Sequence, residues 1–257
     1  MNSTIDLNCD LGEGFGVYSL GSDAAIMPHV TSINVAAGFH AGDPATIRQT
    51  LELALNYKVN IGAHPGLPDL VGFGRRNMSV SAQEVYDLVL YQIGAVYGFT
   101  RAAGLNLMHV KPHGALYNMA SKDRSLADAI ASAIYRFDLN LILVGLAGSE
   151  LIHAGQAIGL TTASEGFLDR NYEPDGNLTP RNHPEAIIHS PEIVAARALE
   201  WIRSGVVTAR TGQRLTVMID TLCIHGDSPN APDLCKRVRK SLEEQQIAVQ
   251  PMNKKRA

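Results

Sequence analysis

Residues that mark extracellular, membrane or redox-active proteins are scarce in this sequence. It has three cysteines among 257 residues and no C-x-x-C pair, a pattern typical of reduced thiols in a cytoplasmic protein. The longest apolar run, residues 139–148, is too short to span a bilayer. Two aspartates within the first ten residues argue against a secretory signal. We therefore expect a soluble cytoplasmic protein without a membrane segment.

The sequence also lacks a strong charge of either sign and several familiar catalytic motifs. Its 22 basic and 25 acidic residues give a net charge of -3, and no basic stripe points to nucleic acid. No G-x-S-x-G or G-x-x-x-x-G-K-[ST] motif occurs, and the glycines near the N-terminus lack the spacing of a dinucleotide fingerprint. A serine-hydrolase elbow, a phosphate loop and a Rossmann site are therefore not predicted.

The stretch DLNCDLGEGFG at residues 6–16 combines a strand pattern with a polar face. Apolar residues alternate here with Asp6, Asn8 and Asp10, and a period of two is typical of a β-strand. The following glycines end the strand and hold Glu13 in a turn. Similar polar clusters follow later apolar segments, so we expect them to meet at one candidate active site.

Strand patterns alternate with helical patterns about seven times along the chain. Expected strands cover residues 5–11, 32–37, 59–63, 105–110, 139–144, 161–164 and 215–224. Expected helices cover residues 44–57, 81–104, 121–137, 149–158, 190–204 and 230–245. Such alternation implies parallel strands joined by right-handed crossovers, with ligands bound after the strands and before the helices.

A barrel accounts for the polar residues of the first strand better than an open doubly wound sheet does. A sheet covered on both faces has to bury Asp6, Asn8 and Asp10 without partners. The length of 257 residues also suits a single α/β barrel. We therefore predict one barrel domain over residues 1–257, with a basic tail at 253–257 that frays.

Several candidate side chains follow the second and third strands. His40 and Asp43 come after the second strand, and His64 ends the third. Asp43 is also well placed to cap the next helix, a structural role that the sequence favours, and a lone histidine carries little weight. Arg75 and Arg76 form either a solvated surface pair or a clamp for carboxylate or phosphate.

The segment HVKPHG at residues 109–114 is the densest cluster. His109 and His113 have the H-x-x-x-H spacing of a helical metal pair, but a proline and a glycine in the segment argue against a helix. Lys111 stands where a strand ends. There it can polarise a carbonyl, hold an anion or, if burial lowers its pKa, donate a proton.

Two later segments add further charged groups. The long loop at residues 165–184 contains Asp169, Arg170 and Arg181, and such a loop is either a surface hairpin or a lid. The run CIHGDSPNA contributes His225 after the last apolar segment. The long loops at residues 64–77 and 165–184, both rich in arginine and aspartate, are the rim at which we expect another protein to dock.

Six segments together resemble the LamB/YcsF family. They are DLNCDLGEGFG at 6–16, NVAAGFHAGDP at 34–44, GAHPGLPDLVGFGRR at 62–76, HVKPHGALYN at 109–118, EGFLDRNYEPDGNLTPR at 165–181 and CIHGDSPNA at 223–231. The resemblance covers nearly the whole chain, and six long motifs in the right order make it highly specific. It departs at Ala37, where the family commonly has cysteine, so we expect no nucleophilic role there.

The resemblance implies an α/β fold, a distorted seven-stranded (β/α) barrel of the glycoside hydrolase/deacetylase superfamily. It also implies ATP-dependent opening of 5-oxo-L-proline to L-glutamate, with ATP and magnesium as co-substrate and 5-oxoprolinase subunits B and C as partners. A five-membered lactam is a stable amide that needs activation. Because the chain has no phosphate loop, we expect a partner to supply much of the phosphoryl transfer.

Mechanistic roles follow as a hypothesis. Asp10 or Glu13, with His113 or His64, deprotonates the attacking water, while Lys111 or His225 stabilises the oxyanion. The substrate carboxylate pairs with Arg75, Arg76 or Lys111. The predicted catalytic set is Asp10, Glu13, His64, Lys111 and His113. The predicted substrate-binding set is Asn8, His40, Asp43, Arg75, Arg76, Tyr117, Asp169, Arg170, Arg181 and His225.

Two alternatives remain open from the sequence. One is a divalent-metal-dependent hydrolase or deacetylase whose ligands are Asp10, His64 and either His109 or His113. The other is a non-catalytic subunit that binds a lactam or a sugar, although so many ionisable groups exceed what binding alone needs. The sequence does not decide whether a metal is bound.

Overall fold

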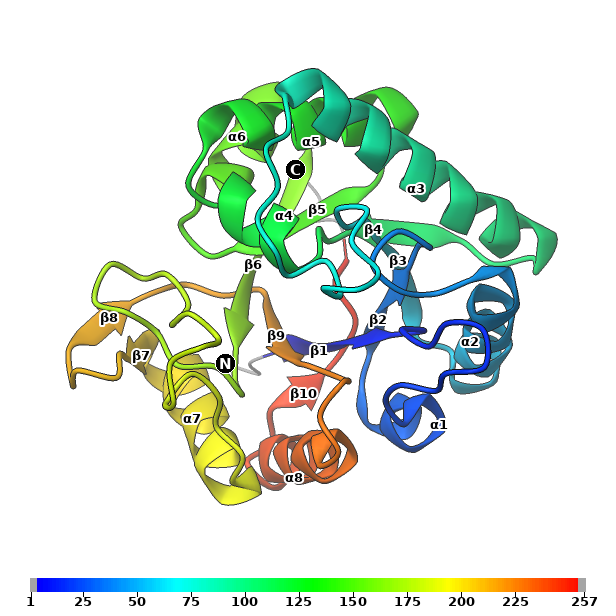
Figure 1. Ribbon diagram of the computed structural model, residues 1–257. Coiled ribbons are helices and arrows are strands. Elements are labelled where there is room, and N and C mark those ends of the chain that lie inside the picture. The colour runs from blue at the N-terminus through cyan, green and yellow to red at the C-terminus, as the bar shows by residue number, and fades with distance from the viewer. Residues whose placement is uncertain (1–3, 254–257) are drawn as a thin grey trace.

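The computed structural model describes residues 4–253 and shows a closed barrel of seven parallel strands surrounded by helices (Figure 1). The strands are β1 (Thr4–Leu11), β2 (Ser32–Ala36), β3 (Asn60–His64), β4 (Leu107–Val110), β5 (Ile142–Leu146), β6 (Thr161–Phe167) and β9 (Thr221–Ile224). They follow one another around the barrel in this order, and β9 pairs with β1 to close it. In β1, Asn8 lies beside Ser32 on one side and Cys223 on the other. The predicted seven-stranded barrel is confirmed.

Helices cover the outer face of the strands, as the crossovers between parallel strands require. They are α1 (Asp23–Ile26), the 3-10 turn η1 (Met27–His29), α2 (Pro44–Tyr57), α3 (Ala82–Ala102), α4 (Gly114–Ala120), α5 (Arg124–Phe137), α6 (Glu150–Ile158), α7 (Pro191–Ser204) and α8 (Ala231–Glu244). None of these helices is long and apolar enough to cross a membrane.

The alternation in β1 sorts its side chains between two environments. Leu7, Cys9 and Leu11 point outward and join the large hydrophobic core between strands and helices. Asn8 and Asp10 point into the barrel, where each finds hydrogen-bond partners. The polar interior that the sequence predicted is therefore real, and its cost is offset because these groups are paired.

Helix boundaries agree with the capping signals, with one exception. Asp43 caps α2, and Ser81 forms a capping box with Glu84 at the start of α3. The predicted start of a helix at residue 121 is wrong, because Asp123 is the cap of α5. The short helix α4 precedes it and is not predicted by the sequence, since its first residue is a glycine with positive φ.

The last predicted strand also differs from the structure. Residues 215–224 contain the end of β8 (Arg214–Thr216), which pairs with β7 (Val206–Thr208) in a separate hairpin, and then β9. An added strand, β10 (Ala248–Val249), pairs with the start of β1. Of the tail that we expected to fray, residues 254–257 lie outside the described residues.

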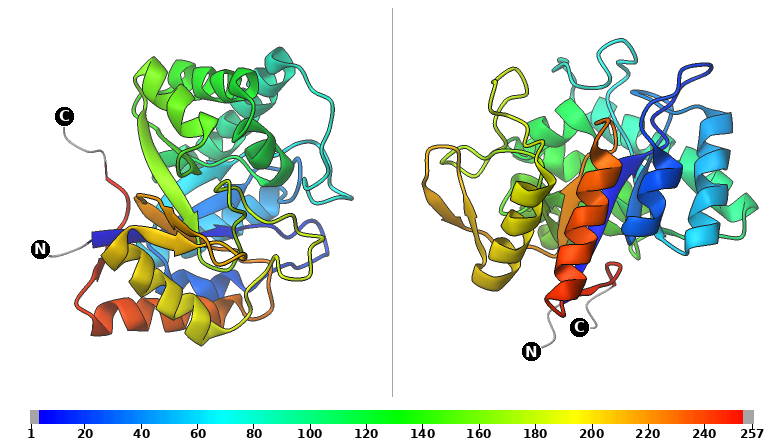
Figure 2. Two further views of the ribbon diagram at one scale, coloured as in Figure 1. Left: turned by 90° about the vertical axis from the view of Figure 1, so that its left-hand side faces the viewer. Right: turned by 90° about the horizontal axis from the view of Figure 1, so that it is seen from below.

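The two ends of the barrel differ in character. Figure 2 shows the long loops gathered at one end, with β10 and the start of β1 at the other. The loop end is where the strands have their carboxyl termini, the usual place of catalytic residues in α/β barrels. Inside the barrel, toward the opposite end, a small apolar cluster of Ile142, Val144, Ala163 and Met252 is separate from the outer core.

Candidate active site

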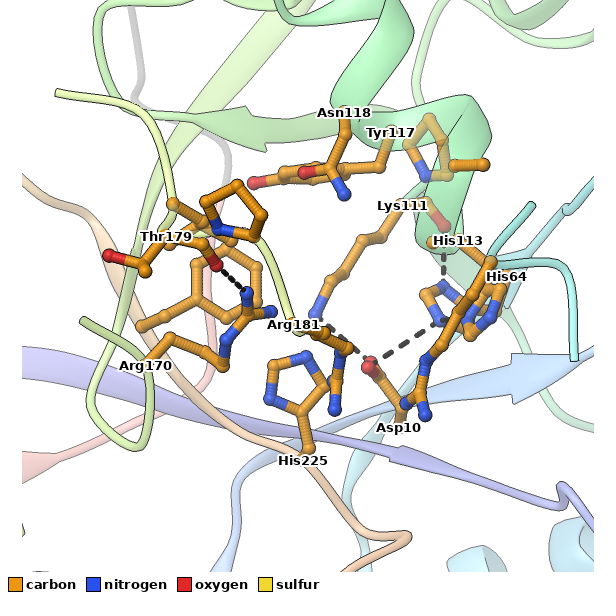
Figure 3. A pocket seen from close by; sticks show the side chains of 17 residues that line it. Asp10, His64, Lys111, His113, Tyr117, Asn118, Arg170, Thr179, Arg181 and His225 are labelled. Atoms are coloured by element: carbon orange, nitrogen blue, oxygen red, sulfur yellow. Dashed lines mark hydrogen bonds and ion pairs between the residues drawn. The ribbon is translucent and has the colours of Figure 1, made fainter. Parts of the chain in front are cut away.

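A cavity of about 290 Å³ opens at the carboxyl ends of the strands (Figure 3). This is close to the lower limit of small-molecule sites. Its charged and aromatic lining comprises Asp10, His64, Arg75, Lys111, His113, Tyr117, Phe167, Arg170, Arg181 and His225. Nine of these ten side chains belong to the predicted site, so the separate sequence clusters do converge.

Lys111 is at the centre of the cavity floor and joins two carboxylates. Its Nζ lies 3.0 Å from Asp10 Oδ1 and 2.8 Å from Glu165 Oε1. Asn8 Oδ1 at 3.3 Å and Cys223 Sγ at 3.1 Å complete its surroundings. Because an ammonium has three hydrogens, these contacts use all its donors.

The protonation states of Lys111 and Asp10 are fixed by the groups around them. Burial opposes ionisation of Lys111, but the neighbouring charges, Asp10 foremost, raise its pKa well above the usual value. Burial also opposes ionisation of Asp10, yet His64 and Lys111 outweigh it and hold the pKa of Asp10 well below its usual range. Lys111 is therefore a permanent cation, and the idea that burial lowers its pKa to make it a proton donor is not supported.

A hydrogen-bonded network inside the barrel supports Asp10 and Glu165 from below. Asn34 donates from Nδ2 to Asp10 Oδ1 and Asn8 Oδ1, both at 2.8 Å. Asn8 donates in turn to Glu165 Oε1 at 3.0 Å, and Tyr117 donates to Glu165 Oε2 at 2.8 Å. Asn8 and Tyr117, predicted to bind substrate, thus hold a carboxylate in place.

A group of imidazoles lies beside Asp10. His64 Nε2 is 3.5 Å from Asp10 Oδ2, and His113 Nδ1 is 3.0 Å from His64 Nε2. His40 stacks on His113 with ring centroids 3.7 Å apart. Glu13 completes the group, and all four predicted residues are buried. We call Glu13, His40, His64 and His113 the histidine cluster.

His225 and Asp169 form a separate pair on the other side of the cavity. The imidazole Nδ1 lies 3.0 Å from both carboxylate oxygens of Asp169. Burial lowers the pKa of His225, an effect that the Asp169 carboxylate opposes. Since Nδ1–H donates to Asp169, the lone pair of Nε2 is left for another partner, an arrangement common in proton-transfer sites.

The four predicted arginines have very different roles. Arg75 Nη2 is 2.6 Å from Asp227 Oδ2. Arg170 donates to the carbonyl oxygens of Thr179 and Ala186 and so holds the second long loop together. Arg76 is bound to Asp69 and lies away from the cavity.

Arg181 is the arginine of the cavity that is available to pair with a bound ligand. It lines the cavity and is partly buried, yet within residues 4–253 its guanidinium forms no hydrogen bond and no ion pair. Burial accordingly lowers its pKa. An unpaired guanidinium in a cavity is a ready partner for a planar carboxylate.

Asp43 lies outside the cavity lining. Its carboxylate accepts hydrogen bonds from the N–H groups of Ala45 and Thr46 at the start of α2 and from Gly16 in the opening loop. The structural role that the sequence favoured is thus present. A part in substrate binding stays a prediction.

Comparison with known proteins identifies the family of this chain. The chain matches the LamB/YcsF family over residues 5–257. It belongs to this family. Among curated relatives, the 5-oxoprolinase A subunit of Bacillus subtilis is 53% identical over 253 residues, covering 98% of each chain. The protein of the same name from Methylococcus capsulatus is 55% identical, covering 97% of this chain and 96% of its own.

Solved structures give the same assignment for the fold. A lactam utilization protein from Thermus thermophilus superposes with a TM-score of 0.92 at 47% identity, covering 97% of this chain and all of its own. The catalytic domain of a peptidoglycan N-acetylglucosamine deacetylase from Eubacterium rectale superposes with a TM-score of 0.54 at 12% identity, covering 100% of this chain and 91% of its own. The second likeness shows a shared barrel fold.

Some site residues of this LamB/YcsF protein are not among those predicted from the sequence. The sequence places Glu165 at the start of a loop, although β6 continues to Phe167. Asn34 alternates with apolar neighbours in β2, the same signal that identified Asp10, and could have been found that way. Asp227 lies in the segment CIHGDSPNA, but its pairing with Arg75 has no local signal, because the two residues are 152 positions apart in the chain.

Proposed function

We propose that this chain is the A subunit of a 5-oxoprolinase and that the barrel cavity opens 5-oxo-L-proline to L-glutamate. Curated relatives of that name match at more than half identity over nearly the full length. The observation that carries the proposal is the cavity itself, which combines the unpaired Arg181 with ionised Asp10 and the His225–Asp169 pair. The substrate offers one carboxylate and one lactam, and the cavity provides a group for each.

The carboxylate of 5-oxoproline pairs with Arg181 in this proposal. Lys111, the alternative from the sequence, has all its donors occupied by protein groups. Arg75 is held by Asp227, and Arg76 faces away from the cavity. Arg181 is therefore the guanidinium whose pairing with substrate breaks no hydrogen bond or ion pair to the described part of the chain.

Asp10 and His225 act on the attacking water. Asp10 Oδ1 is occupied by Lys111 and Asn34, while among the described residues Oδ2 has only His64 at 3.5 Å. We assign Oδ2 to positioning the water, because the depressed pKa makes Asp10 a weak base. The Nε2 atom of His225 takes the proton and returns it to the ring nitrogen when the C–N bond breaks, with Asp169 orienting the imidazole.

ATP and magnesium enter as co-substrate through the partner subunits. The γ-phosphoryl group passes to the lactam oxygen and ADP leaves. Water then adds to the carbonyl carbon and the C–N bond breaks, and a second water splits the resulting acyl phosphate into glutamate and phosphate. An enclosed site is needed because the phosphorylated species would hydrolyse unproductively in bulk water.

The partner surface lies beside the cavity. Six large apolar side chains are exposed on the loops after β1 and β3, namely Phe15, Val17, Tyr18, Leu20, Leu70 and Val71. Val17 is 90% exposed and Val71 is 93% exposed, and five of the six line one shallow pocket that reaches Glu13 and His40. We call these six residues the mouth patch and propose that one of the partner subunits covers it, since exposed apolar patches mark interaction sites.

The charged rim that the sequence suggested is less suited to docking. Asp169 is buried and bound to His225, so it belongs to the cavity. Arg75 is partly buried against Asp227 and stacks on Phe73. Apolar residues are thus the better candidates for a partner contact.

The proposal is tested by measuring 5-oxoproline turnover with ATP and magnesium, with and without subunits B and C. We expect negligible turnover by the isolated chain and full turnover by the three together. Glutamate formation and ADP formation are measured in parallel, because coupling of ATP cleavage to lactam opening requires that the two products form in equal amounts. Robust ATP-driven turnover by the isolated chain would place a nucleotide site within these 257 residues and contradict the partner assignment.

A further inference from the structure

The histidine cluster brings together four side chains from four different loops and strand ends. Glu13 follows β1, His40 follows β2, His64 ends β3 and His113 precedes α4. All four are buried, and one ligand atom from each lies within 4.8 Å of the others. Three imidazoles and a carboxylate form a donor set typical of zinc and similar divalent ions.

Hydrogen bonds to backbone carbonyls fix which ring nitrogens carry protons. His64 Nδ1 is 2.7 Å from the carbonyl oxygen of Lys111, and His113 Nε2 is 2.8 Å from that of Phe73. A carbonyl oxygen only accepts, so each of these nitrogens must be the donor. In the neutral form of each ring, which is the form that binds a metal ion, the other nitrogen, His64 Nε2 or His113 Nδ1, therefore carries a lone pair.

These two lone pairs face each other at close range. His64 Nε2 and His113 Nδ1 are 3.0 Å apart. A hydrogen bond between them would need one ring to be doubly protonated and charged. A shared cation uses both lone pairs instead, because ligands at about 2.1 Å from one ion are about 3.0–3.4 Å apart.

Glu13 and His40 lie beside the same two nitrogens. Glu13 Oε1 lies 3.7 Å from His113 Nδ1 and 3.8 Å from His40 Nε2, both beyond hydrogen-bond distance. His40 is fully buried, and in the part of the chain that the structure describes neither of its ring nitrogens has a partner. Buried polar groups without partners are costly, and a bound ion would offset that cost for Glu13 directly and for His40 only once its ring turns.

Ring orientation decides which residues bind first. His40 and His113 are stacked with only 3° between their planes, whereas His64 is nearly perpendicular to both. A metal ion lies in the plane of each imidazole that binds it, so two parallel stacked rings cannot both bind one ion. His64, His113 and Glu13 are therefore the primary ligands, and His40 joins them only after its ring turns out of the stack.

The carbonyl contacts also support the ligands. Metal-binding histidines usually donate their second N–H to a carbonyl or a carboxylate, which fixes ring orientation. His64 and His113 both do so, through the carbonyl oxygens of Lys111 and Phe73. Gly74 allows this packing, because a Cβ at its position would lie 2.6 Å from His40 Cβ and 2.8 Å from His113 Cδ2.

We propose that the histidine cluster is a binding site for one divalent transition-metal ion of the zinc class, held by Glu13, His64 and His113. The ligand set differs from the one considered from the sequence in having Glu13 in place of Asp10. Of the two histidines left open there, His113 belongs to it and His109 does not, because His109 Nε2 lies 2.8 Å from Asn34 Oδ1. The inference does not depend on 5-oxoprolinase activity.

Cobalt(II) titration of the chelator-treated full chain tests the site, because bound cobalt has visible absorption that reports nitrogen ligation. We expect one cobalt ion per chain, displaced by zinc. His64→Ala, His113→Ala and the nearly isosteric Glu13→Gln should each weaken binding at least tenfold. His109→Gln, which changes a neighbouring buried histidine outside the cluster, should bind cobalt as the parent does.

Thermal unfolding with and without zinc is a second readout that does not require turnover. The parent should gain stability with zinc, since an ion that binds only the folded state raises its melting temperature, and Glu13→Gln should gain less. No bound cobalt at millimolar concentration, or equal affinity in folded Glu13→Gln and parent, would overturn the inference. Cobalt binding in a chain without 5-oxoprolinase activity would support the ion site and count against the proposed function alone.

Discussion

At the scale of single residues, the main distinction is between charges that are already paired and charges that are free. Lys111 and Arg75 are committed to carboxylates of the protein, whereas Arg181 has no such partner within residues 4–253. Nothing local in the sequence separates these cations. Their roles depend on partners such as Asp227, 152 residues from Arg75. Asp10 was predictable because strand periodicity alone placed it inside the barrel.

Replacing Arg181 tests the assignment of the substrate carboxylate. Arg181→Met should raise the KM for 5-oxoproline about 10- to 100-fold, because a charged hydrogen-bonded contact contributes about 1.5–3 kcal/mol. Steady-state kinetics of the complete complex measures this effect. Arg124→Met, which removes an exposed arginine of α5, is the control. An unchanged KM in Arg181→Met would assign the carboxylate to another group.

The buried side chain of His109 should make the stability of the fold depend on pH. Burial lowers its pKa to about 3, against about 6.5 in an unfolded chain. Since the folded-state pKa is depressed, the unfolded state binds the extra proton between these values. The associated stability is present above pH 6.5 and is lost as pH falls toward 3, by up to about 1.4 kcal/mol per pH unit.

Urea unfolding at a series of pH values measures this slope. The parent should lose stability steeply below pH 6.5, with His40 and His113 adding to the effect because burial also lowers their pKa. His109→Gln keeps a hydrogen-bond donor for Asn34. It should reduce the slope of unfolding free energy against pH by the amount that corresponds to about one bound proton. Parallel curves for parent and variant would show that His109 is not the titrating group.

At the scale of helices and strands, local sequence signals predicted most of the elements. The others depend on tertiary contacts that the sequence does not show. The cap Asp43 and the capping box at Ser81 are local, and both were found. Helix α4 and the hairpin of β7 and β8 have no strong local signal. The full length of β6 is not evident from the sequence, because Glu165 looks like a loop residue until its partners Lys111 and Tyr117 are known.

Asp43 offers a test at this scale. Asp43→Ala removes the cap of α2 and the contact to Gly16, and should cost about 1 kcal/mol, or about 2–4 °C in melting temperature. Asp43→Asn can still cap the helix and should retain most of the stability. The melting temperature is measured by calorimetry, and the KM for 5-oxoproline is measured for the same variants. A large rise in KM with no change in melting temperature would make Asp43 a substrate residue.

At the scale of the whole molecule, the barrel places the cavity and the mouth patch on the same end. The loop after β1 carries both Glu13 of the histidine cluster and exposed apolar side chains, and the pocket that these side chains line also reaches His40. The sequence predicted a docking rim but favoured charged residues, because the exposure of an apolar side chain is a property of the folded surface. A partner seated there would close the cavity from solvent.

Val71→Glu tests the mouth patch. Val71 is almost fully exposed, so the charge should leave folding unchanged while weakening assembly with subunits B and C at least tenfold. Analytical ultracentrifugation of the mixed subunits measures assembly. Leu139→Glu is the matched control, because Leu139 is also exposed and lies outside the patch. Equal loss in both variants would mean that the patch is not the contact.

The central claim is that the lactam opens in the barrel cavity, and turnover by a complex carrying Asp10→Asn tests it most directly. The change is nearly isosteric, and Lys111 keeps its ion pair with Glu165, so the variant chain should fold and assemble normally. With Asp128→Asn on the surface as control, we predict a loss of at least 100-fold in kcat for glutamate formation. Turnover within twofold of the parent, in a complex that is fully assembled, would contradict the account.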